Sequence, residues 1–185
     1  GAPGPRGTAP SFRMHPAILA RAPATLEVWY PGRRGLGLGC GEALNEHGVA
    51  GYWPEVPERI NRMFEAIEII TKLFSGRDVK HDGRFFKMEM CRLWTLPKKA
   101  PPIYIATAGP VTAKRTGQFA DGLITVGAPE EKIGMVFGKF EEGALEAGQD
   151  PSKIPKILNL NLSRAETAEQ ADAQAASQRP NGGMH

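Results

Sequence analysis

Hydrophobic residues recur at helical spacing most clearly between residues 55 and 75. The positions of this face are Ile60, Met63, Phe64, Ile67, Ile70, Thr71 and Phe74. Steps of three and four residues place such side chains on one side of an α-helix, and Gly76 follows as a C-terminal stop. The pattern predicts an amphipathic helix with a buried apolar face. A second helix is predicted from Pro16 to Trp29, with a kink or a restart at Pro23 because proline lacks the backbone N–H.

The second half of the chain alternates short apolar runs with helical segments. Strands are predicted at 103–106, 121–126 and 154–162, and helices at 111–119, 129–147 and 166–177. A further strand is predicted earlier in the chain, at 34–39. Strands and helices that alternate in this way form a parallel sheet with right-handed crossovers. Both a closed barrel and an open doubly wound sheet satisfy this order, so the periodicity alone leaves the choice open.

Two segments depart from the alternation. Residues 1–10 hold so many glycines and prolines that neither helix nor strand is expected there, and we interpret them as an irregular arm. Residues 79–96 carry Asp82-Gly83 between two partly apolar runs, which predicts an inserted β-hairpin. The rest of the chain holds about four strands, whereas a closed (β/α)8 barrel needs eight strands and about 250 residues. If the fold is a barrel, this chain alone holds only part of it.

The composition is that of an ordinary globular chain. Of 185 residues, 41% are hydrophobic and 23% charged, and 23 Lys and Arg against 20 Asp and Glu give a net charge of +3. The basic residues form no long block, so we expect no nucleic-acid partner. Cys40 and Cys91 lack metal-ligand spacing and are too few for a disulfide framework, which indicates a reducing, cytoplasmic location and no metal site. No apolar run approaches the roughly 20 residues of a membrane span, and no signal peptide is recognisable.

A small-residue strand followed by a carboxylate is the first candidate site. Gly35, Gly37, Gly39 and Gly41 alternate along the strand predicted at 34–39, and this leaves one face nearly bare. Such a face admits a flat ring or another backbone, although glycines also permit tight strand–helix packing. Glu42 follows at the strand's C-terminal mouth, where barrel enzymes place catalytic groups. The alternative for Glu42 is an N-cap or first-turn carboxylate that complements a helix dipole.

Two strand-to-helix loops are candidate anion sites. Thr107-Ala108-Gly109-Pro110 follows the strand at 103–106, and Gly127-Ala128-Pro129 follows the strand at 121–126. Free backbone N–H groups and the helix dipole at such a loop can receive a phosphate. The alternative for both loops is an ordinary strand-to-helix turn.

A family resemblance enters at GLGCGEALNE, residues 37–46. This segment resembles the strand-to-loop motif of the deazaflavin-dependent oxidoreductases of the luciferase-like superfamily, among them the glucose-6-phosphate dehydrogenases. The companions in family order are FRMHPA (12–17), WPE (53–55), Glu58-Arg59, PIYIA (102–106), ADG (120–122) and PNGGM (180–184). The resemblance implies an α/β fold, a partial luciferase-like TIM (β/α)8 barrel with the inserted β-hairpin. Residues 11–185 would be the central part of one domain, without its N- and C-terminal strands.

The resemblance also implies a chemistry. The expected cofactor is coenzyme F420, with hydride transfer between it and a small organic substrate and with Glu42 as the catalytic acid or base. The cofactor-binding residues that it implies are Gly39, Cys40, Gly41, Asn45, Ala108, Gly109 and Val126. In the family's sugar-phosphate members the later loop offers a hydroxyl and a lysine, whereas Val126 and Pro129 stand at those places here. Glucose 6-phosphate is therefore not the expected substrate.

Further expectations accompany the resemblance. An FMN-dependent luciferase-like monooxygenase is an alternative on the same barrel, and a non-catalytic barrel fragment or assembly partner is an alternative of another class. Intact relatives are expected to form homodimers. Cys40 is a packing thiol in one interpretation and a nucleophile in the other, and we favour packing because a small buried thiol behaves as a hydrophobe. Trp53 follows the motif and could close over a bound ring.

Overall fold

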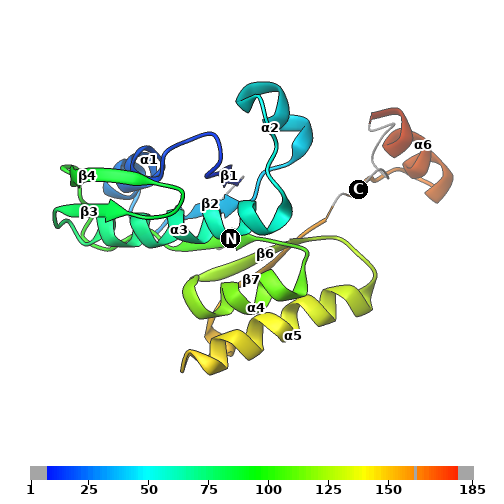
Figure 1. The fold of residues 1–185 in the computed structure, drawn as a ribbon. Helices are drawn as coiled ribbons and strands as arrows, with labels where there is room; N and C mark the ends of the chain where they lie inside the picture. Colours follow the sequence, from blue (N-terminus) through cyan, green and yellow to red (C-terminus); the bar gives the residue numbers. More distant parts are fainter. Residues whose placement is uncertain (1–7, 161, 179–185) are drawn as a thin grey trace.

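A five-stranded parallel sheet forms the centre of the molecule (Figure 1). The computed structural model describes residues 8–160 and 162–178. In sheet order the strands are β1 (Ala9–Pro10), β2 (Leu36–Gly39), β5 (Ile103–Ala106), β6 (Gly122–Val126) and β7 (Lys156–Asn159). All neighbouring pairs run parallel. The carboxyl ends of the five strands therefore lie along one edge of the sheet.

Helices carry the chain from one strand to the next. They are α1 (Pro16–Trp29), α2 (Ala43–Ala50), α3 (Val56–Phe74), α4 (Pro110–Phe119), α5 (Glu130–Glu146), the 3-10 turn η1 (Pro151–Lys153) and α6 (Ala168–Gln178). Helix α1 packs against α3, and α4 packs against α5, as Figure 1 shows. None of the helices in residues 8–160 and 162–178 is long and apolar enough to cross a bilayer.

Helix α3 supplies more residues to the larger core cluster than any other element. Its buried residues are Met63, Phe64, Ala66, Ile67, Ile69, Ile70 and Leu73. They pack with α1, β2, β5 and the hairpin, and each large apolar side chain buried in this way contributes about 1.5–3 kcal/mol. A smaller cluster joins Ala113, Leu123, Val136 and Phe140 between α4, α5 and β6. The helix predicted at 55–75 is thus confirmed, and Gly76 follows it with a φ of +73°.

A two-stranded antiparallel sheet stands apart from the main sheet. It consists of β3 (Val79–Asp82) and β4 (Lys87–Cys91), with a register shift between Val79 and His81. Glu65 of α3 ties the turn of this hairpin to the core, since its carboxylate accepts hydrogen bonds from the backbone N–H groups of Phe85 and Phe86. The inserted hairpin predicted at 79–96 is confirmed.

The remaining predicted elements agree with the structure except at four points. The strand predicted at 154–162 is shorter, since β7 covers only Lys156–Asn159. Helix α1 has the predicted bounds, but it continues through the buried Pro23 without a restart. Ala9 and Pro10 pair with Leu38 and Gly39 as strand β1, so the predicted irregular arm was wrong for these two residues. Proline is tolerated there because β1 lies at the edge of the described sheet. Residues 1–7 of the predicted arm lie outside the described residues. Helix α2 was not predicted, because it is eight residues long and includes Gly48.

Candidate functional site

The carboxyl ends of β1, β2 and β5 meet around Gly39. Pro10 and Ala106 are the register partners of Gly39 on its two sides. A Cβ atom built on Gly39 would lie 3.4 Å from Thr8 Oγ1 and 3.8 Å from Ala106 Cβ, which are ordinary contact distances. Glycine at this position is therefore not required by the packing of the strands. Its effect is to leave the wall of the strand end open.

Gly35 behaves differently from Gly39. A Cβ atom on Gly35 would lie 2.6 Å from Tyr104 Cε2, and one on Gly122 would lie 2.5 Å from Tyr104 Cδ1. The Tyr104 ring thus covers two glycines of the neighbouring strands. The two interpretations of the glycine-rich strand therefore apply to different residues: Gly35 permits tight packing, and Gly39 borders an open space.

That open space is a pocket of about 250 Å³ at the carboxyl edge of the sheet. Five of its lining residues were predicted as site residues: Gly39, Cys40, Gly41, Glu42 and Asn45. The others are Thr8, Pro10, Arg13, Glu46 and Ala106. A pocket that holds a whole drug-sized ligand usually measures about 300–1,000 Å³. The described residues therefore form a wall for part of a ligand, such as a ring or a substituent.

Glu42 occupies the N-cap position of α2 with an extended backbone, but its side chain makes no capping hydrogen bond. The side chain is exposed, and among the described residues its partner is the Asn45 side-chain amide, which donates to Oε2 at 3.4 Å. Glu42 therefore stands at the N-cap position, but its side chain does not cap the helix. The carboxylate remains available to a ligand in the pocket.

Glu46 and Arg13 form an ion pair beside Glu42, in which Glu46 is buried and Arg13 is partly exposed. The Glu46 side chain is 2% exposed, and the Arg13 Nε atom lies 2.6 Å from its Oε2 atom. The N–H group of Arg13 is not directed at this oxygen, since Oε2 has no hydrogen-bond partner within the described part of the chain. The pair is therefore held by charge and packing, and it leaves an acceptor oxygen unused.

Cys40 packs as a thiol. Its Sγ donates to Met63 Sδ at 3.8 Å, and Met63 belongs to the buried core. Burial raises the pKa of the Cys40 thiol, and the nearby positive charge of Arg59 opposes this only in part. Because the thiolate is the nucleophile, a raised pKa favours the packing interpretation.

The other three predicted residues share the edge of the sheet but not the pocket wall. Ala108 and Gly109 follow β5, and the Gly109 N–H already donates to Thr107 Oγ1 at 3.1 Å. Val126 ends β6 and is 53% exposed. Helix α5 begins after Pro129 with Glu130 and Glu131 in its first turn, and these carboxylates oppose an anion at that helix end.

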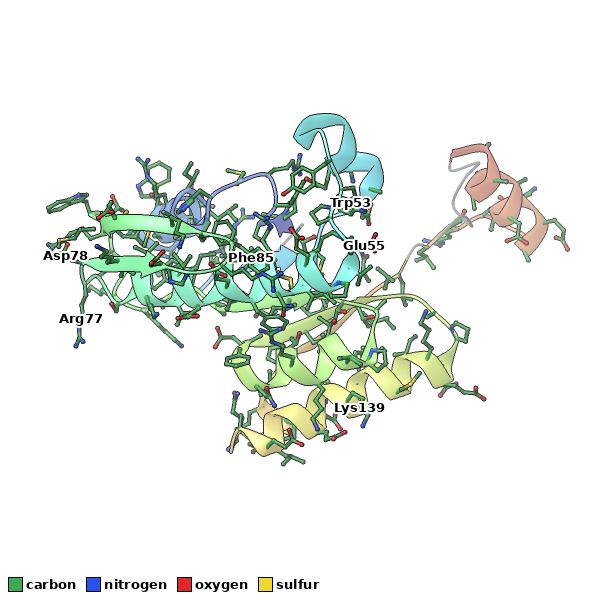
Figure 2. All side chains as sticks on the ribbon, viewed as in Figure 1. Trp53, Glu55, Arg77, Asp78, Phe85 and Lys139 are labelled. Carbon is green, nitrogen blue, oxygen red and sulfur yellow. The ribbon has the colours of Figure 1, made fainter. Side chains whose placement is uncertain are left out.

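Two polar residues of the pocket, Arg13 and Glu46, received no firm role from the sequence. Arg13 follows β1, and this strand was not predicted because residues 1–10 are rich in glycine and proline. Glu46 lies four residues after Glu42, a spacing that places both on one face of a helix if α2 is recognised. Trp53 does not line the pocket; it lies in the segment just before α3 (Figure 2). The Arg59 guanidinium group lies over its ring, 4.2 Å from the centroid. No three His, Cys, Asp or Glu side chains of the described residues cluster to hold a metal ion.

Comparison with known proteins identifies the family. The family described as luciferase-like monooxygenase matches residues 6–184. The chain belongs to this family. The expected luciferase-like resemblance is therefore confirmed, and the parallel sheet with its helices is part of a luciferase-like (β/α) barrel.

Individual members of the luciferase-like family show moderate identity to this chain. An F420-dependent glucose-6-phosphate dehydrogenase of Mycolicibacterium smegmatis is 39% identical over 158 residues, which are 83% of this chain and 47% of that protein. A protein of the same name from Microbacterium testaceum is 36% identical over 156 residues, or 83% of this chain and 46% of that protein. The chain thus spans about half the length of these curated relatives.

A solved structure gives the likeness in three dimensions. An F420-dependent secondary alcohol dehydrogenase, in complex with an F420–acetone adduct, superposes with a TM-score of 0.80 at 40% identity. The superposition covers 84% of this chain and 48% of that one. The two chains therefore share both the fold and a substantial part of the sequence.

Proposed function

We propose that this protein is an F420-dependent oxidoreductase that transfers a hydride between the deazaflavin and a small alcohol or carbonyl compound. The observation that carries the proposal is the pocket at the end of β2, in which Gly39 leaves an open wall and Glu42 presents an exposed carboxylate. The F420-dependent relatives at 36–40% identity support the cofactor.

The residues present fit a flat ring at this place. A side chain at 39 would occupy the wall that this glycine leaves open, and the register partner Ala106 is also small. Gly39, Cys40, Gly41 and Asn45 would hold the ring, and Ala108, Gly109 and Val126 would reach more distant parts of the cofactor along the sheet edge. When bound, F420 supplies the hydride acceptor or donor.

Glu42 would manage the proton. Oxidation of an alcohol to a carbonyl compound releases a hydride from carbon and a proton from the hydroxyl oxygen. A carboxylate within hydrogen-bond reach of the reacting group can take up or return such a proton. Glu42 suits this task because its side chain is exposed at the pocket and has no capping bond that holds it elsewhere.

A substrate without a phosphate group is favoured. Val126 and Pro129 stand in the loop that carries a hydroxyl and a lysine in the family's sugar-phosphate members, and the first turn of α5 holds Glu130 and Glu131. Two carboxylates at a helix N-terminus repel an anion that the helix dipole would otherwise attract. The substrate class that we propose is a small, uncharged secondary alcohol or its ketone.

Cofactor titration tests the proposal. The purified protein, its E42Q variant and an E55Q control are titrated with oxidised F420 and separately with FMN, followed by fluorescence. Glu55 is a matched control because it is also an exposed N-cap glutamate without a capping bond, at the start of α3. We expect the unmodified protein to bind F420 saturably and in preference to FMN. The E42Q variant should bind F420 more weakly, and the E55Q variant should bind it with unchanged affinity. Equal or absent binding of both flavins by the unmodified protein would overturn the proposal.

A further inference from the structure

The loops that follow β1 and β2 are joined by an ion pair between a buried carboxylate and a partly exposed guanidinium group. Arg13 lies in the segment between β1 and α1, and Glu46 lies in the first turn of α2. Their 2.6 Å contact therefore links two loops at the carboxyl edge of adjacent strands. A carboxylate that is 2% exposed has lost nearly all of its hydration, so it depends on this cation for its stability.

The same carboxylate packs beneath the turn that carries Glu42. Gly41 has a φ of +79°, and a Cβ atom built on it would lie 2.9 Å from Glu46 Cγ and 3.2 Å from Pro10 Cβ. The Glu46 side chain and Pro10 thus enclose the Gly41 backbone, which can approach them because it has no side chain. Packing against the Glu46 side chain therefore fixes the position of this turn.

The backbone then connects Glu46 to Glu42 directly. The amide N–H groups of Asn45 and Glu46 both donate to the Glu42 carbonyl oxygen at 3.0 Å. The Glu42 side chain, by contrast, has only the 3.4 Å contact with the Asn45 amide to orient it. Its location therefore depends on the backbone of the turn, and the turn depends on Glu46 and Arg13.

We infer that Glu46 and Arg13 form a positioning pair that holds the Gly41–Glu42 turn, and with it the Glu42 carboxylate, in place for the cofactor pocket. This inference rests on the proposed function for its link to F420. Glu46 acts through the turn, and its buried charge is matched by Arg13 so that it does not have to be hydrated.

Amide hydrogen exchange tests the positioning without any cofactor. Exchange at the Asn45 and Glu46 amides is measured for the unmodified protein, E46Q, R13Q, the R13Q/E46Q double variant and a D78N control. Asp78 pairs with Arg92 at 2.6 Å in the exposed part of the hairpin, so D78N removes a similar ion pair far from the turn in sequence. Amides in the core of α3, such as that of Ile69, report any general loss of stability.

We expect E46Q and R13Q each to accelerate exchange at the Asn45 and Glu46 amides by about tenfold, the effect of one lost buried polar interaction. The double variant should exchange no faster than the worse single variant, because it leaves no uncompensated charge. D78N should leave both amides unchanged. Unchanged exchange in E46Q, or acceleration that is equal at the α3 core, would overturn the inference.

F420 affinity then tests the link to the pocket. If the pair acts through Glu42, E46Q and E42Q each weaken binding, and E42Q/E46Q is no weaker than the worse of the two. Additive losses would show that Glu46 acts independently of Glu42 and would contradict the link. Failure of the unmodified protein to bind F420 would refute the proposed function, whereas the exchange rates would still decide whether the pair holds the turn.

Discussion

The Glu65 carboxylate accepts a 2.9 Å hydrogen bond from the backbone N–H of Phe86 and so fastens the inserted hairpin to α3. His81 Nε2 lies 3.1 Å from the same carboxylate, whose side chain is 13% exposed. Burial raises the pKa of Glu65, but the hydrogen bonds from Phe86, His81 and Phe85 outweigh it, so the pKa is lowered below the ordinary value of 4.5. The charged form is thus the one that the folded state stabilises.

Substitution of Glu65 by Gln should destabilise the protein at neutral pH. The variant loses a charged acceptor for two backbone donors, which costs about 1–3 kcal/mol in the free energy of unfolding. Since the folded pKa is lowered, this contribution is present above pH 4.5 and disappears as the pH falls through the folded value. Urea unfolding of both proteins at about pH 7 and pH 3 should show a difference that narrows at the lower pH.

The control for Glu65 is Glu68, which lies about one turn further along α3 and is exposed to solvent. Glu68 pairs with Lys72 at 2.5 Å, and both side chains are about half exposed. E68Q should change the free energy of unfolding by less than about 1 kcal/mol. If E68Q costs as much as E65Q, the hairpin is not anchored by the Glu65 carboxylate.

Substitution of Gly117 or Gly143 by Ala should separate α4 from α5. A Cβ atom on Gly117 would overlap the Phe140 carbonyl oxygen, and one on Gly143 would overlap that of Lys114. Because backbone cannot move aside as a flexible side chain can, we expect each variant to lose about 1–3 kcal/mol or more. Thermal unfolding measures the loss.

Gly138 is the matched control within α5. A Cβ atom there would meet no atom within 4 Å. Alanine at an open helical position should stabilise the protein by about 0.5–1 kcal/mol. Equal effects of G138A and G143A would show that the two helices do not pack through their glycines.

Gly39 and Gly35 should separate binding from packing. G39A places a methyl group at ordinary contact distances in the pocket wall, so the protein should unfold at nearly the same temperature and bind F420 more weakly. G35A drives its methyl group into Tyr104 Cε2 and should lower the unfolding temperature. Reversal of this order, with G39A the more destabilising, would show that the open wall is structural.

Cys40 should react slowly for a cysteine beside a pocket. Burial raises its pKa, so little thiolate is present at neutral pH. Alkylation of Cys40 by iodoacetamide, followed by mass spectrometry, should be slower in the folded protein than after unfolding. Rapid alkylation of the folded form would contradict the packing role.

Elements with strong periodicity could be predicted from the sequence. Helix α3 and the hairpin were predicted because their apolar spacing and turn residues agree with their burial. Strand β1 and helix α2 could not be, since the first has only two residues and the second only eight. Arg13 follows β1 and Glu46 lies in α2. Because neither element was predicted, their ion pair could not be predicted either.

Part of the pocket wall could be predicted because it follows one continuous motif. Gly39, Cys40, Gly41, Glu42 and Asn45 line one pocket and lie close together in the chain. Residues from other strands depend on how far each loop extends from the sheet edge, which spacing along the chain does not specify. The roles of Glu42 and of all the predicted cofactor-binding residues, the homodimer and the cytoplasmic location stay predictions.

The location of the cofactor tests the central claim most directly. Amide chemical shifts of the isotope-labelled protein are recorded by NMR while oxidised F420 is added. The account predicts saturable shifts concentrated at Gly39–Glu46 and Ala106, with the hairpin at Val79–Cys91 unaffected. Shifts confined to other surfaces, or no shifts at concentrations that saturate an intact F420-dependent relative, would contradict it.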